Sequence, residues 1–147
     1  RALKQADLVQ LMTLFPQDFT RRQKERVYDT YEPLTLHDST LSYGVHALLA
    51  FQLGRGEAAM DYLLRSAFLD LYDVMGNTGS EGIHVAALGA TWQAVVFGML
   101  GLWSENGELT LAPQLPESIR RISLTVRHHG RRLRVTADHD GARTEEV

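Results

Sequence analysis

The chain has 147 residues, of which 44% are hydrophobic, and it carries a formal net charge of −3 at pH 7. This length fits one ordinary domain, or the end of one domain followed by a small second one. The slight negative charge excludes a basic field for nucleic acid or an anionic membrane surface. The absence of cysteine excludes disulfides and thiolate metal sites.

Residues 1–16 predict an amphipathic helix that ends at Pro16. Lys4 and Gln5 interrupt its apolar pattern. They are either ordinary helix formers with solvated ends, or a pair that hydrogen-bonds sugar hydroxyls, which need both donors and acceptors. Since the pattern starts without an initiator Met, we expect the C-terminal part of a longer protein. The apolar positions recur near a period of 3.6 residues at Leu3, Ala6, Leu8, Leu11, Met12 and Phe15.

Residues 17–30 are polar and predict a short helix that is capped by Asp18 or Thr20. The stretch YEPLTLHDSTLS, residues 31–42, then begins with a turn around Pro33 and ends with a His, an Asp and three hydroxyl residues within six positions. One interpretation makes Ser39 or Thr40 the cap of a helix that begins near residue 41, with Asp38 favoured by the helix dipole.

The other interpretation of residues 31–42 is an anion site. A helix start offers free N–H groups, and flanking hydroxyls complete a site for an oxyanion such as phosphate. His37 would add a charge-assisted hydrogen bond. Composition alone leaves the two interpretations open.

Residues 41–54 and 56–74 predict two helices joined by a very short turn, which implies an antiparallel hairpin. Gly54 is suited to close the first helix, because glycine readily adopts positive φ after a helix end. The expected buried side of the second helix comprises Ala59, Tyr62, Leu63, Ala67, Leu69 and Leu71.

A Gly- and Asn-rich loop follows, and then a long apolar helix over residues 83–102. His84 lies at its entrance, where a histidine is either structural or a ligand. Gly89 costs about 1 kcal/mol relative to alanine inside a helix, so packing or a ligand should explain it and its small neighbour Ala90. Trp92 and Trp103 are expected in the core, although an indole can also stack on a sugar face.

From Trp103 onward the pattern alternates with period two, which predicts strands. Residues 122–137 predict a hairpin around Gly130, and residues 141–147 are frayed or an edge. Adjacent His128 and His129 should point to opposite faces of a strand and share no ligand. We therefore predict a mainly α chain with a small antiparallel β module, divided into residues 1–103 and 104–147, without a metal site.

Several strings of this sequence resemble glycoside hydrolase family 65, which is typified by maltose, trehalose and kojibiose phosphorylases and includes some hydrolases. The similarity covers nearly the whole chain. It implies the last helices of an (α/α)6 barrel followed by a small antiparallel β-sandwich C-terminal domain. The strings are LKQADLVQLM, YEPLTLHDSTLS, LDLYDVMGNTGSEGIHVAALGATWQAVVFGMLGL and LTLAPQLPESIRRISLTVRHHGRRLRV.

The resemblance also implies a chemistry. Family members cleave an α-glucosidic disaccharide with inversion, a Glu general acid protonating the leaving oxygen while phosphate attacks the anomeric carbon. That Glu lies upstream of this segment in the family, so we expect no catalytic residue here. Lys4 and Gln5 match the pair that binds the transferred glucosyl unit. Matching the phosphate site are Ser39, Thr40, His84, Gly89 and Ala90, with His37 and Asp38 as orienting neighbours; Ala90 departs from the usual second glycine.

The resemblance leaves three interpretations of function. The first is part of an α-glucoside phosphorylase, with inorganic phosphate as co-substrate and no cofactor. The second is a hydrolase of the same family, in which Glu32 or Asp38 is the candidate base for water. The third is a structural or sugar-binding module that is inactive in isolation. The expected partners are a disaccharide, phosphate and the rest of the catalytic domain, with a homodimer as the assembly and the cytoplasm as the location.

Overall fold

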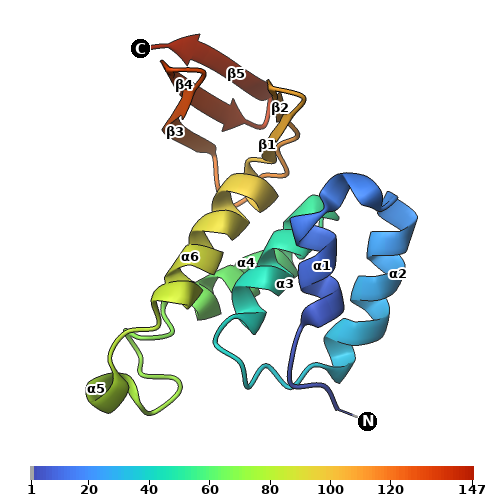
Figure 1. The fold of residues 1–147 in the computed structure, drawn as a ribbon, viewed down its shortest axis with the longest axis vertical. Helices are drawn as coiled ribbons and strands as arrows, with labels where there is room; N and C mark the ends of the chain where they lie inside the picture. Colours follow the sequence, from blue (N-terminus) through green and yellow to red (C-terminus); the bar gives the residue numbers. More distant parts are fainter. Residues whose placement is uncertain (1) are drawn as a thin grey trace.

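The computed structural model describes residues 2–147. Helices occupy the chain as far as Met99 and strands begin at Leu102, so the predicted mainly α fold with an antiparallel β module is confirmed (Figure 1). The helices are α1 (Asp7–Leu14), α2 (Arg21–Tyr31), α3 (Ser42–Gln52), α4 (Gly56–Ala67), α5 (Thr78–Glu81) and α6 (Val85–Gln93), with 3₁₀ turns at η1 (Pro16–Asp18) and η2 (Glu32–Leu34) and a π-helical turn at η3 (Ala94–Met99).

The first helix is shorter than predicted. It begins at Asp7, and Lys4 and Gln5 lie in the segment before it, where Leu3 pairs with Thr35 in a parallel bridge. The prediction that Lys4 and Gln5 sit on a helix is therefore wrong. The bridge explains why, since backbone hydrogen bonds to residues 34 and 36 hold the chain extended there.

The second helix starts as predicted. The Thr20 side chain accepts from the backbone N–H of Gln23, and the Gln23 side chain accepts from the backbone N–H of Thr20. This reciprocal capping box satisfies two of the free donors at the helix start. Of the two predicted caps, Thr20 is thus the one used.

Helices α3 and α4 form the predicted hairpin, and Gly54 closes α3 with φ of +75°. Buried side chains cover α3 nearly all round, as expected of a helix that lies inside a core. The prediction for α4 fails at its end, because the helix stops at Ala67 and Leu71 is 75% exposed. The main core contains Val9, Met12, Tyr28, Val45, Leu48, Leu49, Phe51, Ala59, Leu63 and Met99.

The predicted long helix is continuous from α6 into η3. Gly98 lies in η3 against α3, where an added Cβ would meet Leu48 Cα at 3.0 Å. Trp92 is 56% exposed, so its predicted place in the core is wrong. None of the described helices combines the length and apolar character that a membrane span requires.

The β module consists of two antiparallel sheets, one of the pair β1–β2 and one in the order β3–β4–β5. Leu102, Val135 and Ala137 are buried with Val96 of η3 and with Leu100, the residue after η3, in a second core cluster, which joins the module to the helices. Edge strand β5 fulfils the expectation for the tail. The strands are β1 (Leu102–Glu105), β2 (Glu108–Leu111), β3 (Arg121–His128), β4 (Arg131–Asp138) and β5 (Gly141–Glu146).

The hairpin turn at Gly130 corrects one prediction. His129 adopts φ of +47° and so leaves the strand geometry. The two imidazoles therefore converge, and Nε2 of His128 and Nε2 of His129 lie 2.9 and 2.8 Å from the same Gly107 carbonyl oxygen. The prediction that these histidines point to opposite faces is wrong, and their contacts with the Gly107 carbonyl tie the β3–β4 turn to the β1–β2 turn.

Candidate functional site

The segments that carry the predicted site residues lie at one end of the helical layer, away from the β module. Figure 1 shows the chain before α1, the connection from α2 to α3 and the start of α6 all at its lower end. The helix directions produce this arrangement, because α4 returns along α3 and delivers the chain to the start of α6. Residues distant in sequence are thereby collected at one end.

The segment of Lys4 and Gln5 is fixed to the connection that precedes α3. Leu3 donates its backbone N–H to the Leu34 carbonyl, and the Leu36 N–H donates to the Leu3 carbonyl, both at 2.8 Å. Lys4 and Gln5 are exposed just beyond this bridge. Both side chains are therefore free to meet a ligand at this end of the molecule.

His37 occupies a strained turn between η2 and α3. Its φ of +56° is uncommon for a residue with a side chain. The turn is held because His37 Nδ1 lies 2.7 Å from the hydroxyl of Ser42, which is itself 1% exposed. Backbone strain that the surroundings enforce in this way is typical of functional sites.

Tyr62 links His37 to Glu32. Its hydroxyl donates to Glu32 Oε1 at 2.5 Å and lies 3.2 Å from His37 Nε2. Burial and the bond to Glu32 raise the pKa of Tyr62, so its hydroxyl stays protonated and remains a donor. The structure thus brings together two predicted residues, Glu32 and His37, through a third that was assigned only to the core.

Burial keeps the two histidines of this cluster, His37 and His46, neutral at pH 7. Burial, reinforced by neighbouring His46, lowers the pKa of His37 to about 4. Burial also lowers the pKa of His46, whose Nδ1 lies 2.9 Å from the Ser42 carbonyl oxygen. The expected charge-assisted bond from His37 therefore requires a nearby anion to favour its protonation.

The first turn of α3 has no side-chain cap, and the residue in the cap position is Leu41. The interpretation of Ser39 or Thr40 as a helix cap is therefore wrong. The His37–Ser42 bond closes the turn in place of a capping hydroxyl. Ser39 and Thr40 are partly buried hydroxyl residues just before α3, and the first N–H of that helix, that of Ser42, donates to the Ser39 carbonyl oxygen at 3.0 Å. Hydroxyls beside a helix start are groups that an oxyanion site can use.

His84 is held at the start of α6 by Asp70, which the sequence analysis missed. Asp70 Oδ2 accepts the backbone N–H of His84 at 2.8 Å, and Asp70 Oδ1 lies 2.5 Å from His84 Nδ1. These bonds hold the pKa of Asp70 below its usual range. An ionised carboxylate at this position places the ring proton on Nδ1 and leaves Nε2 for another partner.

The small pair in α6 has two different surroundings. Ala90 is buried against α3, where a Cβ added to Gly44 would come within 2.5 Å of the Ala90 Cβ. The small side chain of Ala90 thus serves close helix packing. Gly89 is exposed, and no described atom lies within 4 Å of a Cβ built on it. Packing within the described residues does not explain Gly89, which leaves a ligand or further chain.

The two halves of the site meet through the packing of α4 and α6. Ser66 in α4 donates to the Ala87 carbonyl oxygen at 3.3 Å and accepts from the Thr91 hydroxyl at 2.8 Å. Among residues 2–147 no hydrogen bond joins His84 to the His37 cluster directly. The structure therefore places both at one end of the helices and ties them through α4.

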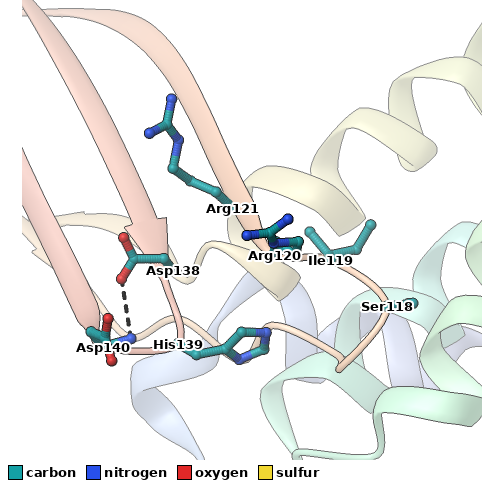
Figure 2. Close-up of a pocket in the computed structure, with 7 residues that line it drawn as sticks. All are labelled: Ser118, Ile119, Arg120, Arg121, Asp138, His139 and Asp140. Atoms are coloured by element: carbon teal, nitrogen blue, oxygen red, sulfur yellow. Dashed lines mark hydrogen bonds between the residues drawn. The ribbon is translucent and has the colours of Figure 1, made fainter.

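The hollow in Figure 2 contains none of the residues assigned to the phosphate site. It lies in the β module, where Arg120 and Arg121 share the surface with the carboxylates of Asp138 and Asp140. Asp138 accepts the backbone N–H of Asp140 at 3.1 Å. With both signs of charge so close together, this hollow offers no field for an anion. Within residues 2–147 there is also no cluster of three or more side chains that suits a metal ion.

Comparison with known proteins agrees with the resemblance. The family model for the glycosyl hydrolase family 65 central catalytic domain matches residues 1–93, and that for the family's C-terminal domain matches residues 103–146. Maltose phosphorylase of Bacillus subtilis is 38% identical over 92% of the chain, and α,α-trehalose phosphorylase of Thermoanaerobacter brockii is 39% identical over 90%. The chain spans only 18% and 17% of those two proteins.

A solved structure is similar in fold as well as in sequence. A human-microbiome protein assigned as a kojibiose phosphorylase superposes on 99% of this chain with a TM-score of 0.89 and 31% identity. The match covers 20% of that protein. The arrangement of the helices and the β module is therefore common to both.

Proposed function

Because the chain belongs to glycoside hydrolase family 65, we propose that it forms the sugar- and phosphate-binding end of an inverting α-glucoside phosphorylase. In this proposal residues 1–103 complete the catalytic barrel and residues 104–147 form the C-terminal β domain. The substrate is a disaccharide of the trehalose, maltose or kojibiose type, and inorganic phosphate is the second substrate. The general acid comes from a part of the protein outside these residues.

One observation supports the proposal most strongly. The bridge between Leu3 and Thr35 holds the Lys4–Gln5 segment beside the connection that contains Ser39 and Thr40. In the proposed site, Lys4 and Gln5 bind the hydroxyls of the transferred glucosyl unit. The hydroxyls of Ser39 and Thr40, at the start of α3, bind the phosphate. The nucleophile is thereby placed next to the sugar that it attacks.

His84 and Gly89 complete the phosphate side in this proposal. Asp70 orients the imidazole, so that Nε2 faces the ligand and not the loop. Gly89 provides open space beside it. The reaction breaks the bond from the anomeric carbon to the leaving oxygen and forms a bond from that carbon to a phosphate oxygen on the opposite face. The external Glu supplies the proton to the leaving oxygen.

The hydrogen bond that engages Glu32 favours the interpretation in which phosphate, not water, is the nucleophile. A hydrolase needs a free carboxylate to activate water, and Glu32 and Asp38 are the candidates in this stretch. Oε1 of Glu32 already accepts the Tyr62 hydroxyl at 2.5 Å, so this oxygen is engaged inside the protein. In the protein with its whole catalytic region, Glu32→Gln should therefore lower the rate of phosphorolysis only modestly. Glucose release without phosphate should stay absent in this variant. Loss of phosphate-independent glucose release on this substitution would instead establish the hydrolase alternative.

The proposal is tested by incubating that longer protein with each disaccharide, with and without phosphate. We expect glucose 1-phosphate only when phosphate is present. Equal glucose release under both conditions, without glucose 1-phosphate, would refute the phosphorylase. We expect no turnover from the 147-residue chain alone, since the general acid is outside it.

Asp70 gives a sharper test of the phosphate side. Asp70→Asn keeps the size but removes the charge that orients His84, and partners of this kind typically contribute about 10–100-fold to the function of a ligating histidine. We expect the KM for phosphate to rise by about that factor. Asp73→Asn is the matched control, because Asp73 accepts the Thr78 N–H in the same loop without touching His84. Equal effects of the two variants would show that loop folding, not His84, is responsible.

A further inference from the structure

A second hollow lies where the helices meet the β module, at the far end of α3 from the proposed phosphate site. Lys24 of α2, Gln52 at the end of α3 and Trp103 of β1 line it. We call it the junction hollow. Its volume is about 410 Å³, which falls within the range of small-molecule sites. It includes none of the residues assigned to phosphorolysis.

The strand pattern explains how Trp103 comes to face this hollow. Trp103 and Thr110 are register partners in the β1–β2 pair, so their side chains share one face of it. Leu102 and Leu109 point to the opposite face and pack into the second core cluster. Phe97 holds the half-buried indole in a T-shaped contact with ring centroids 5.4 Å apart. The hollow thus has one fixed aromatic wall.

Polar groups of both kinds surround that wall. Lys24 Nζ donates to Gln52 Oε1 at 3.3 Å, and Gln52 Nε2 donates to the Phe97 carbonyl oxygen at 3.4 Å. Both bonds are long, so the amide and the ammonium group keep capacity for a ligand. The side chain of Gln114 reaches the hollow from the segment after β2. Amide groups can each donate and accept.

The charges around the hollow nearly balance. Lys24 contributes a positive charge and Glu105 a negative one. Arg21, which also lines the hollow, is engaged by Glu25 at 2.9 Å and by the Leu53 carbonyl oxygen at 2.7 Å. An anionic ligand would need a surplus of free donors, which this arrangement lacks. A neutral ligand with many hydroxyls fits it, because each hydroxyl both donates and accepts.

We propose that the junction hollow binds a neutral pyranose sugar, with the C–H face of the ring on Trp103 and its hydroxyls between Lys24, Gln52 and Gln114. The site is separate from the glucosyl and phosphate groups of the proposed reaction. It stands whether or not the chain takes part in phosphorolysis. Its role is to hold a saccharide at the boundary between the helices and the β module.

Tryptophan fluorescence tests this site directly. The chain has two tryptophans, so Trp92→Phe leaves Trp103 as the sole reporter. Titration of this variant with glucose or maltose should change the Trp103 emission in a saturable way, and calorimetry on the unsubstituted chain should give the same affinity. Inorganic phosphate should leave the emission unchanged. The proposal would be overturned if neither the Trp103 emission nor calorimetry showed sugar binding. It would also be overturned if phosphate changed the emission as much as the sugar does.

Two glutamine variants make the test specific. Gln114→Ala should weaken sugar binding by about two- to tenfold, as expected for the loss of one or two hydrogen bonds. Gln10→Ala, at an exposed position of α1, should leave sugar binding unchanged. Ser39→Ala should also leave it unchanged, which separates this site from the phosphate site. Binding that Gln114→Ala does not alter, or that Ser39→Ala abolishes, would refute the assignment to the junction hollow.

Discussion

Helix α3 and strand β3 differ in the surroundings of their polar side chains. Most positions of α3 are buried, and its polar residues Ser42 and His46 are bonded inside the protein. Nδ1 of His46 contacts the Ser42 carbonyl oxygen, and the Ser42 hydroxyl contacts Nδ1 of His37, which precedes the helix. Strand β3 alternates between half-buried and exposed positions along its whole length. Polar groups of α3 therefore define a rigid local geometry, whereas those on the outer face of β3 remain in water.

This difference indicates why the candidate site is built around α3. A buried polar network costs free energy when any member loses its partner, so its geometry is maintained. The network is not complete within residues 2–147, because the Tyr28 hydroxyl and His46 Nε2 lack a partner there; their rings lie 6.0 Å apart. The outer face of β3 has no such constraint.

The largest expected effect is the loss of a core side chain on α3. Phe51 is 0% exposed, and Phe51→Ala should lower the free energy of unfolding by about 3–5 kcal/mol through lost burial and a residual cavity. Urea unfolding followed by circular dichroism measures it. Thr125→Ala, on the exposed face of β3, is the control and should change stability by no more than about 0.5 kcal/mol. Similar losses from both would remove the contrast.

Two serines with the same kind of bond compare the regions more closely. Ser42→Ala leaves His37 Nδ1 without its partner at a nearly buried site, and we expect a loss of about 1–3 kcal/mol. Ser123→Ala removes a 3.0 Å bond to the Thr136 hydroxyl. Thr136 is only 5% exposed, but Ser123 is exposed, so water can enter the vacated position and replace the bond. Its loss should be at most about 1 kcal/mol. Equal losses would show that burial does not control the value of these bonds.

The same contrast limits what the sequence predicts. The alternation of β3 is a local pattern, so it was enough to predict the hairpin around Gly130. The turn before α3 depends on Tyr62, which lies 25 residues after His37 and reaches Glu32 as well. Asp70 likewise contacts His84, which lies 14 residues later in the sequence. No periodicity encodes such pairs, and the resemblance supplied the candidate residues without their partners.

Stability should also depend on pH through the histidines near α3. The pKa of His37 is about 4 in the folded chain, below the usual 6.5, so the unfolded chain binds more protons between these values. Stability is then greatest above pH 6.5 and falls as the pH drops toward 4. We expect a loss of about 1–2 kcal/mol from His37, discounted because the ring is only partly buried.

The control for the pH effect is a histidine outside the network. His37→Gln should flatten the pH dependence of urea unfolding between pH 6.5 and 4, while His139→Gln, in the exposed turn after β4, should not. The lowered pKa of His46 acts in the same direction, so some dependence should persist in His37→Gln. An unchanged pH profile in that variant would contradict the assignment to His37.

The smallest expected effect is a gain. Arg127 of β3 and Arg132 of β4 are register partners, so two positive side chains face each other across the exposed face of the sheet. Like charges in this position are unfavourable, and opposite charges contribute about 0.2–1 kcal/mol. Arg127→Glu should therefore raise the free energy of unfolding by that amount at low ionic strength. In 1 M salt, where the Debye length is about 3 Å, the gain should largely disappear. A gain in the free energy of unfolding that salt does not reduce would show that the effect is not electrostatic. A decrease in the free energy of unfolding would show that Arg127 itself makes a stabilising contact.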